Sequence, residues 1–375
     1  MTSYATDSKK DLKLIFETSG GEKVYRSENS VVVKLPPNRN SITTSYINGG
    51  YQENLEAIFN HEPNPTRGHC GHDLEGGSVE EYIKIQSKRL GLNPEKTAAM
   101  MTAAKMKNAA ISTRTFRDLE VTAIVTAGIE VNGGRAGDPA NWHEENGSTV
   151  YVGGTINTFL ILSSYLPAHA LTRVIMTATE AKTVAIQQLM APSRYSNGIA
   201  TGSGTDQISV ISNMSSPNVL TWAGKHSKLG ELVALCIIDA TTEALDKQTC
   251  LNPLTQRDML VRLNRFGINE DKYWETAALI EGENKKPVFI ENLREFSKNP
   301  SVVAMTTSLL HIIDEINWGL IPEKSGKTAA YSVMKTLPEM IAVKNQPDFE
   351  HLIDEKMTII ENWIRISSWC IKNGF

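Results

Sequence analysis

Hydrophobic residues follow two different spacings along this chain, and the change between them divides it into two parts. Up to about residue 248, some stretches are apolar at every second position, as in strands, and others at every third or fourth, as in helices. From Asn252 onward only the helical spacing recurs. We therefore expect an α/β or α+β fold: a mixed β-sheet packed with helices in residues 1–248, followed by an all-helical C-terminal region in residues 249–375.

The first part interleaves predicted strands and predicted helices. Strands are expected at residues 12–17, 31–35, 119–131, 149–162 and 199–212. Helices are expected at residues 52–60, 78–90, 167–190 and 229–245. The strand at 119–131 is the clearest, because every second residue from Val121 to Ile129 is apolar. This order is compatible with an αββα sandwich but does not select it over other arrangements.

Lys182 interrupts the apolar stripe of the helix predicted at residues 167–190. It falls between Ala178 and Ala185 on the same helical face. A lysine there either extends its stem outward to water or reaches into a site. Glu180 lies on the opposite face, where the simpler interpretation is a solvated carboxylate, unless the helix begins near Thr179 and Glu180 sits in its first turn.

Residues 200–206 form a glycine-rich segment that enters a predicted strand. Glycine lets a backbone approach a ligand closely. The N–H groups of Gly202 and Gly204 are therefore candidates to stabilise an oxyanion, the charge that develops when an amide carbonyl is attacked. Asp206 either closes the turn through its own backbone or presents a carboxylate beside a pocket.

Five further residues are candidates for binding or catalysis. Arg135 and Asp138 share a loop after a strand, where functional groups are common, although Asp-Pro is also a simple turn. Thr155 is a hydroxyl nucleophile if a base lies near it, and otherwise bonds to backbone; Asn157 follows in the same strand. His226 is a general-base candidate because histidine titrates near neutral pH.

A cluster of His69, Cys70 and His72, with His61 nearby, is the one metal-like group in the sequence. Two histidines and a cysteine are zinc-ligand types, but their spacing matches no standard zinc motif. A loop that contacts substrate is the alternative interpretation. The sequence therefore leaves metal binding open.

Composition narrows the classes of partner and compartment. A net charge of −4 over 375 residues provides no basic field, so we expect no nucleic-acid partner. The four cysteines lack disulfide-type spacing, and residues 1–11 are too polar for a signal peptide, which predicts a cytoplasmic protein. No apolar run reaches about 18 residues, so we expect no membrane-spanning segment.

Several motifs in collinear order resemble the adenosylcobinamide amidohydrolase family, over roughly residues 40–248. They are Tyr46-Ile47-Asn48-Gly49-Gly50, Met101-Thr102-Ala103-Ala104, Val125-Thr126-Ala127-Gly128, Arg135-Ala136-Gly137-Asp138, Gly154-Thr155-Ile156-Asn157, Thr177-Ala178-Thr179-Glu180-Ala181-Lys182, the segment 200–206 and the segment 223–231. One departure is Ser203, where the resemblance leads us to expect threonine. The collinear order makes the likeness more specific than any single motif.

The resemblance implies an enzyme of corrinoid salvage that hydrolyses the amide joining the aminopropanol arm to the corrin ring of adenosylcobinamide, giving adenosylcobyric acid. Cobalt would arrive with the corrinoid substrate, and no cofactor is firmly implied. In this scheme Glu180 or His226 is the base, and Asp206 is its partner. Lys182 protonates the leaving amine or holds a corrin amide oxygen. The substrate-binding candidates are Thr155, Asn157, Thr179, Gly202, Gly204, Thr205, Arg135 and Asp138.

Two other functions remain open from the sequence. One is a self-processing hydrolase whose N-terminal nucleophile, Thr155 or Thr201, is freed by chain scission. The other is a corrinoid-binding protein without catalysis. The many acid, base and hydroxyl groups in the motifs favour an enzyme. The helices after residue 250 have no assigned role, and a homo-oligomer formed through them is one expectation.

Overall fold

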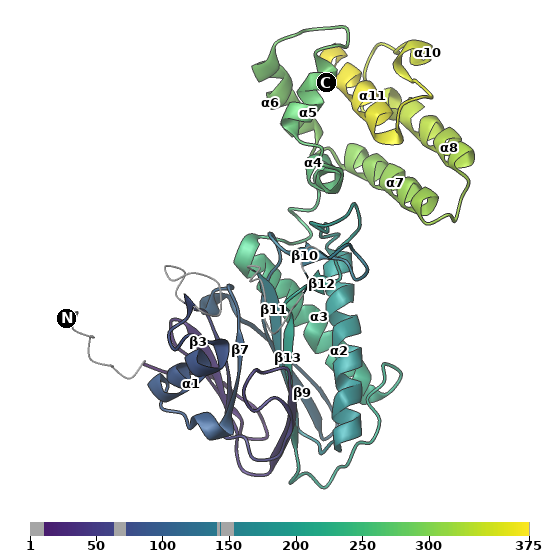
Figure 1. The fold of residues 1–375 in the computed structure, drawn as a ribbon. Helices are drawn as coiled ribbons and strands as arrows, with labels where there is room; N and C mark the ends of the chain where they lie inside the picture. The colour runs from purple at the N-terminus through teal and green to yellow at the C-terminus, as the bar shows by residue number, and fades with distance from the viewer. Residues whose placement is uncertain (1–10, 64–72, 141–142, 144–153, 375) are drawn as a thin grey trace, which may run out of the picture. The chain divides into compact units, whose positions relative to one another are not determined.

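The structure is a computed structural model that describes residues 11–63, 73–140, 143 and 154–374. The chain divides after Asn252 into two compact units, residues 1–252 and 253–375. The first unit contains the strands and three long helices, and the second contains only helices among its described residues (Figure 1). Within the described parts of both units, no helix combines the length and the apolar character needed to cross a membrane.

Two β-sheets form the centre of the first unit. The five-stranded sheet has the order β1 (Lys13–Glu17), β2 (Lys23–Arg26), β3 (Ser30–Lys34), β6 (Ala57–His61) and β7 (Thr97–Met101). The six-stranded sheet has the order β5 (Gly50–Gln52), β4 (Arg39–Thr43), β13 (Gln207–Asn213), β11 (Thr155–Leu162), β9 (Leu119–Gly128) and β8 (Ala110–Phe116). Neighbouring strands are antiparallel, except the parallel pairs β6–β7 and β11–β13.

Helices cover the outer face of each sheet, so the first unit is a four-layer αββα sandwich (Figure 1). Helix α1 (Val79–Arg89) packs on the five-stranded sheet, through Ile83 against Phe59 and its neighbours. Helices α2 (Ala168–Gln188) and α3 (Lys228–Thr249) pack on the six-stranded sheet. A separate apolar layer fills the space between the two sheets.

The run of valines in β3 follows from this layering. Val31 and Val33 point into the layer between the sheets, whereas Val32 points toward α1. All three are fully buried. A strand covered on both faces reads as a continuous apolar run and not as an alternation, because neither face meets water. Ile124 and Val125 divide in the same way in β9, between the inter-sheet layer and the helices.

The second unit is a bundle of helices around one apolar core. Its helices are α4 (Met259–Leu263), α5 (Glu270–Ala277), α6 (Lys286–Phe296), α7 (Pro300–Asn317), α8 (Glu323–Lys335), α9 (Leu337–Met340), α10 (Phe349–Leu352) and α11 (Ile359–Asn373). The core contains Tyr273, Phe296 and Trp363, each almost fully buried. Helix α11 begins with a capping box in which Thr358 and Glu361 bond each other's backbone N–H groups.

The predicted fold class is confirmed: mixed sheets packed with helices, with helices alone in the described C-terminal region. The helix expected at residues 52–60 is wrong, because this stretch ends in strand β6. All five residues of β6 are buried, and Phe59 faces α1 while Ile58 faces the other sheet. A short apolar run buried on both faces has no period that distinguishes a strand from a helix.

Candidate functional site

A cavity of about 690 Å³ opens beside α2, where the two-residue strands β10 (Gly133–Gly134) and β12 (Gly202–Ser203) pair. Its wall includes Arg135, Asp138, Lys182, Tyr195, Ser203 and Thr205. The size lies within the range of small-molecule sites, which run from about 300 to 1,000 Å³. The lining draws on three of the segments that the sequence singled out, those around Arg135, Lys182 and Gly202.

Lys182 lines this cavity and forms an ion pair with Asp206, which follows the lining residue Thr205 and is not itself in the lining. The two side chains are 16% and 15% exposed. Asp206 also accepts hydrogen bonds from the backbone N–H groups of Ile156, at 2.9 Å, and Ser203, at 3.0 Å. The Ser203 hydroxyl lies 2.6 Å from Asp206 Oδ1 and donates to it. Because an ionised carboxylate has about four acceptor sites, this set holds Asp206 fully engaged and fixed in place.

Gly202 leaves the space that this ion pair occupies. A Cβ at Gly202 would lie 2.7 Å from Lys182 Nζ and closer still to Asp206 Oδ2. Real Cβ atoms essentially never make contacts under 3.0 Å, so a larger residue would displace the pair. A Cβ at Gly204, two residues on, would meet no atom within 4 Å. The two glycines of this turn therefore have different roles, although their sequence context is similar.

Asp138 closes the loop that carries Arg135. Its Oδ2 accepts hydrogen bonds from the Arg135 backbone N–H at 2.8 Å and from the Ser193 hydroxyl at 2.6 Å. Burial works to raise the pKa of Asp138, but the hydrogen bonds from Ser193, Ser196 and Arg135 outweigh it and lower the pKa below its ordinary value. Asp138 is thus a carboxylate that shapes the cavity wall, as in the turn interpretation.

Thr155 and Asn157 lie behind the cavity wall and not in its lining. Both are buried in β11, at 3% and 1% exposure. Thr155 Oγ1 donates to the Thr205 carbonyl at 2.7 Å. Asn157 Nδ2 donates to Asn60 Oδ1 and to the Met101 carbonyl, both at 2.8 Å, and so ties the two sheets together. The structure gives these two residues a supporting position next to the turn that holds Asp206.

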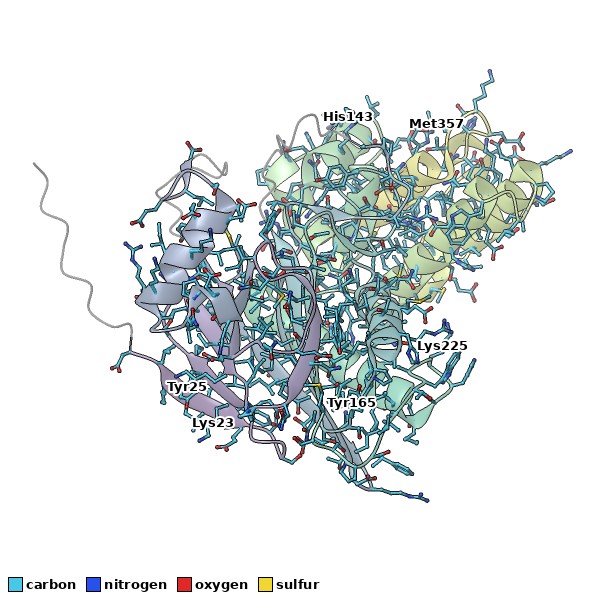
Figure 2. The ribbon with its side chains drawn as sticks, turned by 60° about the horizontal axis from the view of Figure 1, so that its bottom comes forward. Lys23, Tyr25, His143, Tyr165, Lys225 and Met357 are labelled. Carbon is cyan, nitrogen blue, oxygen red and sulfur yellow. The ribbon has the colours of Figure 1, made fainter. Side chains whose placement is uncertain are left out.

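Glu180 lies outside the cavity lining. Helix α2 begins at Ala168, so Glu180 falls in its middle and not in a first turn. Its carboxylate pairs with Lys225 at 2.9 Å, and the two side chains are 53% and 62% exposed. Figure 2 labels Lys225 at the surface of this unit. The solvated interpretation of Glu180 therefore fits the geometry, and its position does not support a role as the base.

The segment 223–231 forms a packing joint between α2 and α3. Buried Ala223 accepts a hydrogen bond through its carbonyl from Thr177 of α2, at 2.8 Å. Ser227 caps α3 by accepting from the Gly230 N–H at 3.1 Å. A Cβ at Gly230 would collide with the Gly224 carbonyl oxygen. His226 is exposed in this joint and, like Glu180, does not line the cavity.

The Ser203 hydroxyl was missed by the sequence reasoning, although Ser203 lines the cavity between Gly202 and Gly204. The available signal was the i, i+3 spacing of Ser203 and Asp206, which suits a side-chain hydrogen bond across a tight turn. The remaining predicted binding residues Thr179, Gly204 and Thr205 do line the cavity. The cluster of His69, Cys70 and His72 falls outside the described residues, and no other group of potential metal ligands occurs among those described.

Comparison with known proteins shows which family the chain matches. The family model described as adenosylcobinamide amidohydrolase matches residues 15–253. An uncharacterized protein of Methanocaldococcus jannaschii is 34% identical over 183 residues, which cover 46% of this chain and 71% of that protein. A crystal structure of a Pyrococcus horikoshii protein aligns over 63% of this chain and 81% of that one, at 12% identity and a TM-score of 0.30, which is too low to support an inference.

Proposed function

The chain belongs to the adenosylcobinamide amidohydrolase family, and on that premise we propose that it hydrolyses the amide between the aminopropanol arm and the corrin ring of adenosylcobinamide. The products are adenosylcobyric acid and aminopropanol, which makes the reaction a step of corrinoid salvage. The observation that carries the proposal is that Lys182, in the lining of the cavity inside the matched region, is held by an ion pair with Asp206.

Lys182 is the proposed acid for the leaving amine. An ammonium group has three N–H donors, and the bond to Asp206 uses one of them. The other two are available to a substrate in the cavity. An amine expelled from an amide must gain a proton as the C–N bond breaks, and a positioned acid contributes about 10²- to 10⁴-fold to such a step. Asp206 holds the ammonium group in position through their ion pair.

Gly204 is the proposed oxyanion donor through its backbone N–H. It is exposed to the cavity and lies two residues before Asp206. A fixed N–H near the attacked carbonyl stabilises the developing negative charge without reorganisation during the reaction. Gly202 is proposed instead to provide room for the ion pair, because its missing side chain is what admits Lys182 Nζ.

The corrinoid is the proposed small-molecule partner, and its aminopropanol arm is the part that enters the cavity. Tyr195 offers an aromatic face there, and Arg135 offers guanidinium N–H donors. Thr179 and Thr205 add polar lining. Cobalt belongs to the substrate in this scheme, and the proposed steps at the amide use groups of this chain and a water molecule.

Incubation of the chelator-treated protein with adenosylcobinamide, followed by mass analysis of the corrinoid, tests the proposal. We expect adenosylcobyric acid and aminopropanol in equal amounts, and neither product from the Lys182→Met variant over the same period. Tight binding of adenosylcobinamide without any product, with or without added zinc, would replace the proposal with a non-catalytic corrinoid-binding role. A wild-type preparation that splits into two chains before it becomes active would instead support the self-processing hydrolase.

A further inference from the structure

We propose that Ser203 is the nucleophile of this amide cleavage, so that the reaction passes through an acyl-enzyme ester on its hydroxyl. The inference rests on the proposed function for its substrate, and goes beyond it by naming the attacking atom. Ser203 lines the cavity, is partly exposed to it, and lies in the turn that carries Asp206.

The hydrogen bonds of the cavity hydroxyls single out Ser203. Among the described residues, four threonine hydroxyls line the cavity, and each donates to a main-chain carbonyl oxygen. The bonds are Thr179 to Ile175 at 2.9 Å, Thr183 to Thr179 at 3.0 Å, Thr201 to Gly134 at 3.5 Å and Thr205 to Gly154 at 2.7 Å. A main-chain carbonyl does not accept a proton at neutral pH, so these hydroxyls have no base. The Ser203 hydroxyl donates to the Asp206 carboxylate at 2.6 Å, which is the geometry of a nucleophile and its base.

The Ser203 oxygen also keeps a lone pair for attack. A serine hydroxyl has one O–H and two lone pairs. Its O–H is directed at Asp206, and the Thr205 N–H donates to one lone pair at 3.2 Å. The backbone N–H of Ser203 bonds the other oxygen of Asp206 at 3.0 Å, which fixes the side chain in this orientation. The Thr205 hydroxyl also lies 3.2 Å from Ser203 Oγ, but it donates to the Gly154 carbonyl at 2.7 Å, so among the described contacts one lone pair of Ser203 Oγ has no donor.

Asp206 and Lys182 together provide a route for the serine proton. Ser203 Oγ bonds to the substrate carbonyl carbon, and its proton passes to Asp206 Oδ1. Lys182, bound to Oδ2 of the same carboxylate, gives a proton to the amine nitrogen as the C–N bond breaks and aminopropanol leaves.

Water completes the cycle with the reverse transfers. A water molecule attacks the ester carbonyl and gives its proton to the neutral Lys182. The C–O bond to Ser203 then breaks, and Asp206 returns its proton to Ser203 Oγ. The net change is one amide bond and one water consumed, one carboxylic acid and one amine formed, and the enzyme restored.

Three variants and two probes test the assignment. Ser203→Ala is expected to lower kcat by about 10³-fold or more, as loss of a nucleophile does, whereas Ser203→Thr keeps the hydroxyl and retains activity. Thr172→Val is the matched control, since it removes a hydroxyl of α2 that donates to the Ala168 carbonyl and lies outside the cavity lining, and it is expected to keep kcat within about threefold of wild type. Thermal unfolding of each variant separates lost chemistry from lost folding.

The first probe is hydroxylamine added during turnover of adenosylcobinamide. Hydroxylamine competes with water for an acyl-enzyme, so the wild type is expected to form the hydroxamate of adenosylcobyric acid, in a proportion that rises with hydroxylamine. The second probe is a fluorophosphonate, which needs no corrinoid. It is expected to label the peptide containing Ser203 with loss of fluoride in the wild type, and to leave Ser203→Ala unlabelled.

The outcomes separate the two proposals. Adenosylcobyric acid formed without hydroxamate, without labelling, and with Ser203→Ala within tenfold of wild type would overturn Ser203 as nucleophile and leave the amidohydrolase function standing with water as the attacking group. Labelling of Ser203 with no cleavage of adenosylcobinamide would retain the nucleophile and reject the substrate. Neither labelling nor cleavage would reject both.

Discussion

The segments 200–206 and 223–231 are similar in the kinds of residue they contain but have different structural roles. Both combine glycines with charged residues, and both belong to the family resemblance. In the first, Gly202 makes room for the Lys182–Asp206 pair, so the segment forms the cavity wall. In the second, Gly230 makes room for the Gly224 carbonyl, so the segment packs the start of α3 against α2.

What distinguishes the two segments is the atom that each glycine accommodates. A glycine whose missing side chain leaves room for side-chain nitrogen and oxygen atoms beside a cavity indicates a functional site. A glycine whose missing side chain leaves room for main-chain atoms indicates close packing of two segments. Charged residues nearby do not distinguish the cases, because His226 and Lys225 are as polar as Lys182 and Asp206 but are exposed.

Removal of the Lys182 amine is the largest effect that this comparison predicts. Lys182→Met keeps an unbranched side chain that is one atom shorter and removes the proposed acid, so kcat is expected to fall by about 10³-fold, within the range for a positioned acid. Steady-state kinetics with adenosylcobinamide measures it. Retention of more than a tenth of wild-type kcat would remove the ion pair from the mechanism.

Gly230→Ala is expected to reduce stability and spare chemistry. Its Cβ would collide with a main-chain oxygen that cannot rotate away, and overpacking of this kind costs about 1–3 kcal/mol, more than the gain in helix propensity of about 1 kcal/mol. Denaturant unfolding measures the loss, and kinetics on the remaining folded protein is expected to match wild type. Unchanged stability would contradict the packing role of the segment 223–231.

Gly202→Ala tests the other segment, with Gly204→Ala as its matched control. The new Cβ at Gly202 meets the ends of two side chains, of which the lysine can move, so we expect a stability loss of about 1 kcal/mol. The displaced Lys182 is also expected to lower kcat. Gly204→Ala has open space around it and is expected to change the free energy of unfolding by no more than about 0.5 kcal/mol. Equal destabilisation by both variants would argue against a steric role for Gly202.

Glu180→Gln and His226→Gln are expected to have the smallest effects. Exposed ion pairs contribute about 0–1 kcal/mol, and Glu180 and Lys225 are each more than half exposed. We expect both variants to stay within about 0.5 kcal/mol of wild-type stability and within about twofold of its kcat. A hundredfold loss of kcat in either variant would return that residue to the role of base and would move the site toward the segment 223–231.

The sequence predicts the helices and strands in which a regular apolar pattern on one face extends over many residues. The positions of β9, α2 and α3 follow from their apolar spacing, and the break at Lys182 in the α2 stripe correctly marks a side chain with an unusual environment. Strand β8 does not stand out, because it is an edge strand rich in threonine and serine whose last three residues are exposed. The pattern at residues 52–60 misleads for the opposite reason, since β6 is buried on both faces.

The site is less predictable, because it depends on contacts between segments that are distant in sequence. Helical geometry alone places Glu180 on the outer face of α2, and the structure agrees. The bond from Asn157 to Asn60 requires the pairing of two sheets, about which a single strand pattern carries no information. The bond from Ser203 to Asp206 is local, but its importance depends on Lys182 arriving from α2.

A double-mutant cycle on Lys182 and Asp206 tests the central claim most directly, that the two residues act as one unit on the amide. Single-turnover conversion of adenosylcobinamide would be measured for wild type, Lys182→Met, Asp206→Asn and the double variant. Groups that act together are strongly non-additive, so the double variant is predicted to be no slower than the slower single variant. The account would be contradicted if the two losses of activation free energy added up in the double variant. It would also be contradicted if the single variants were as fast as wild type.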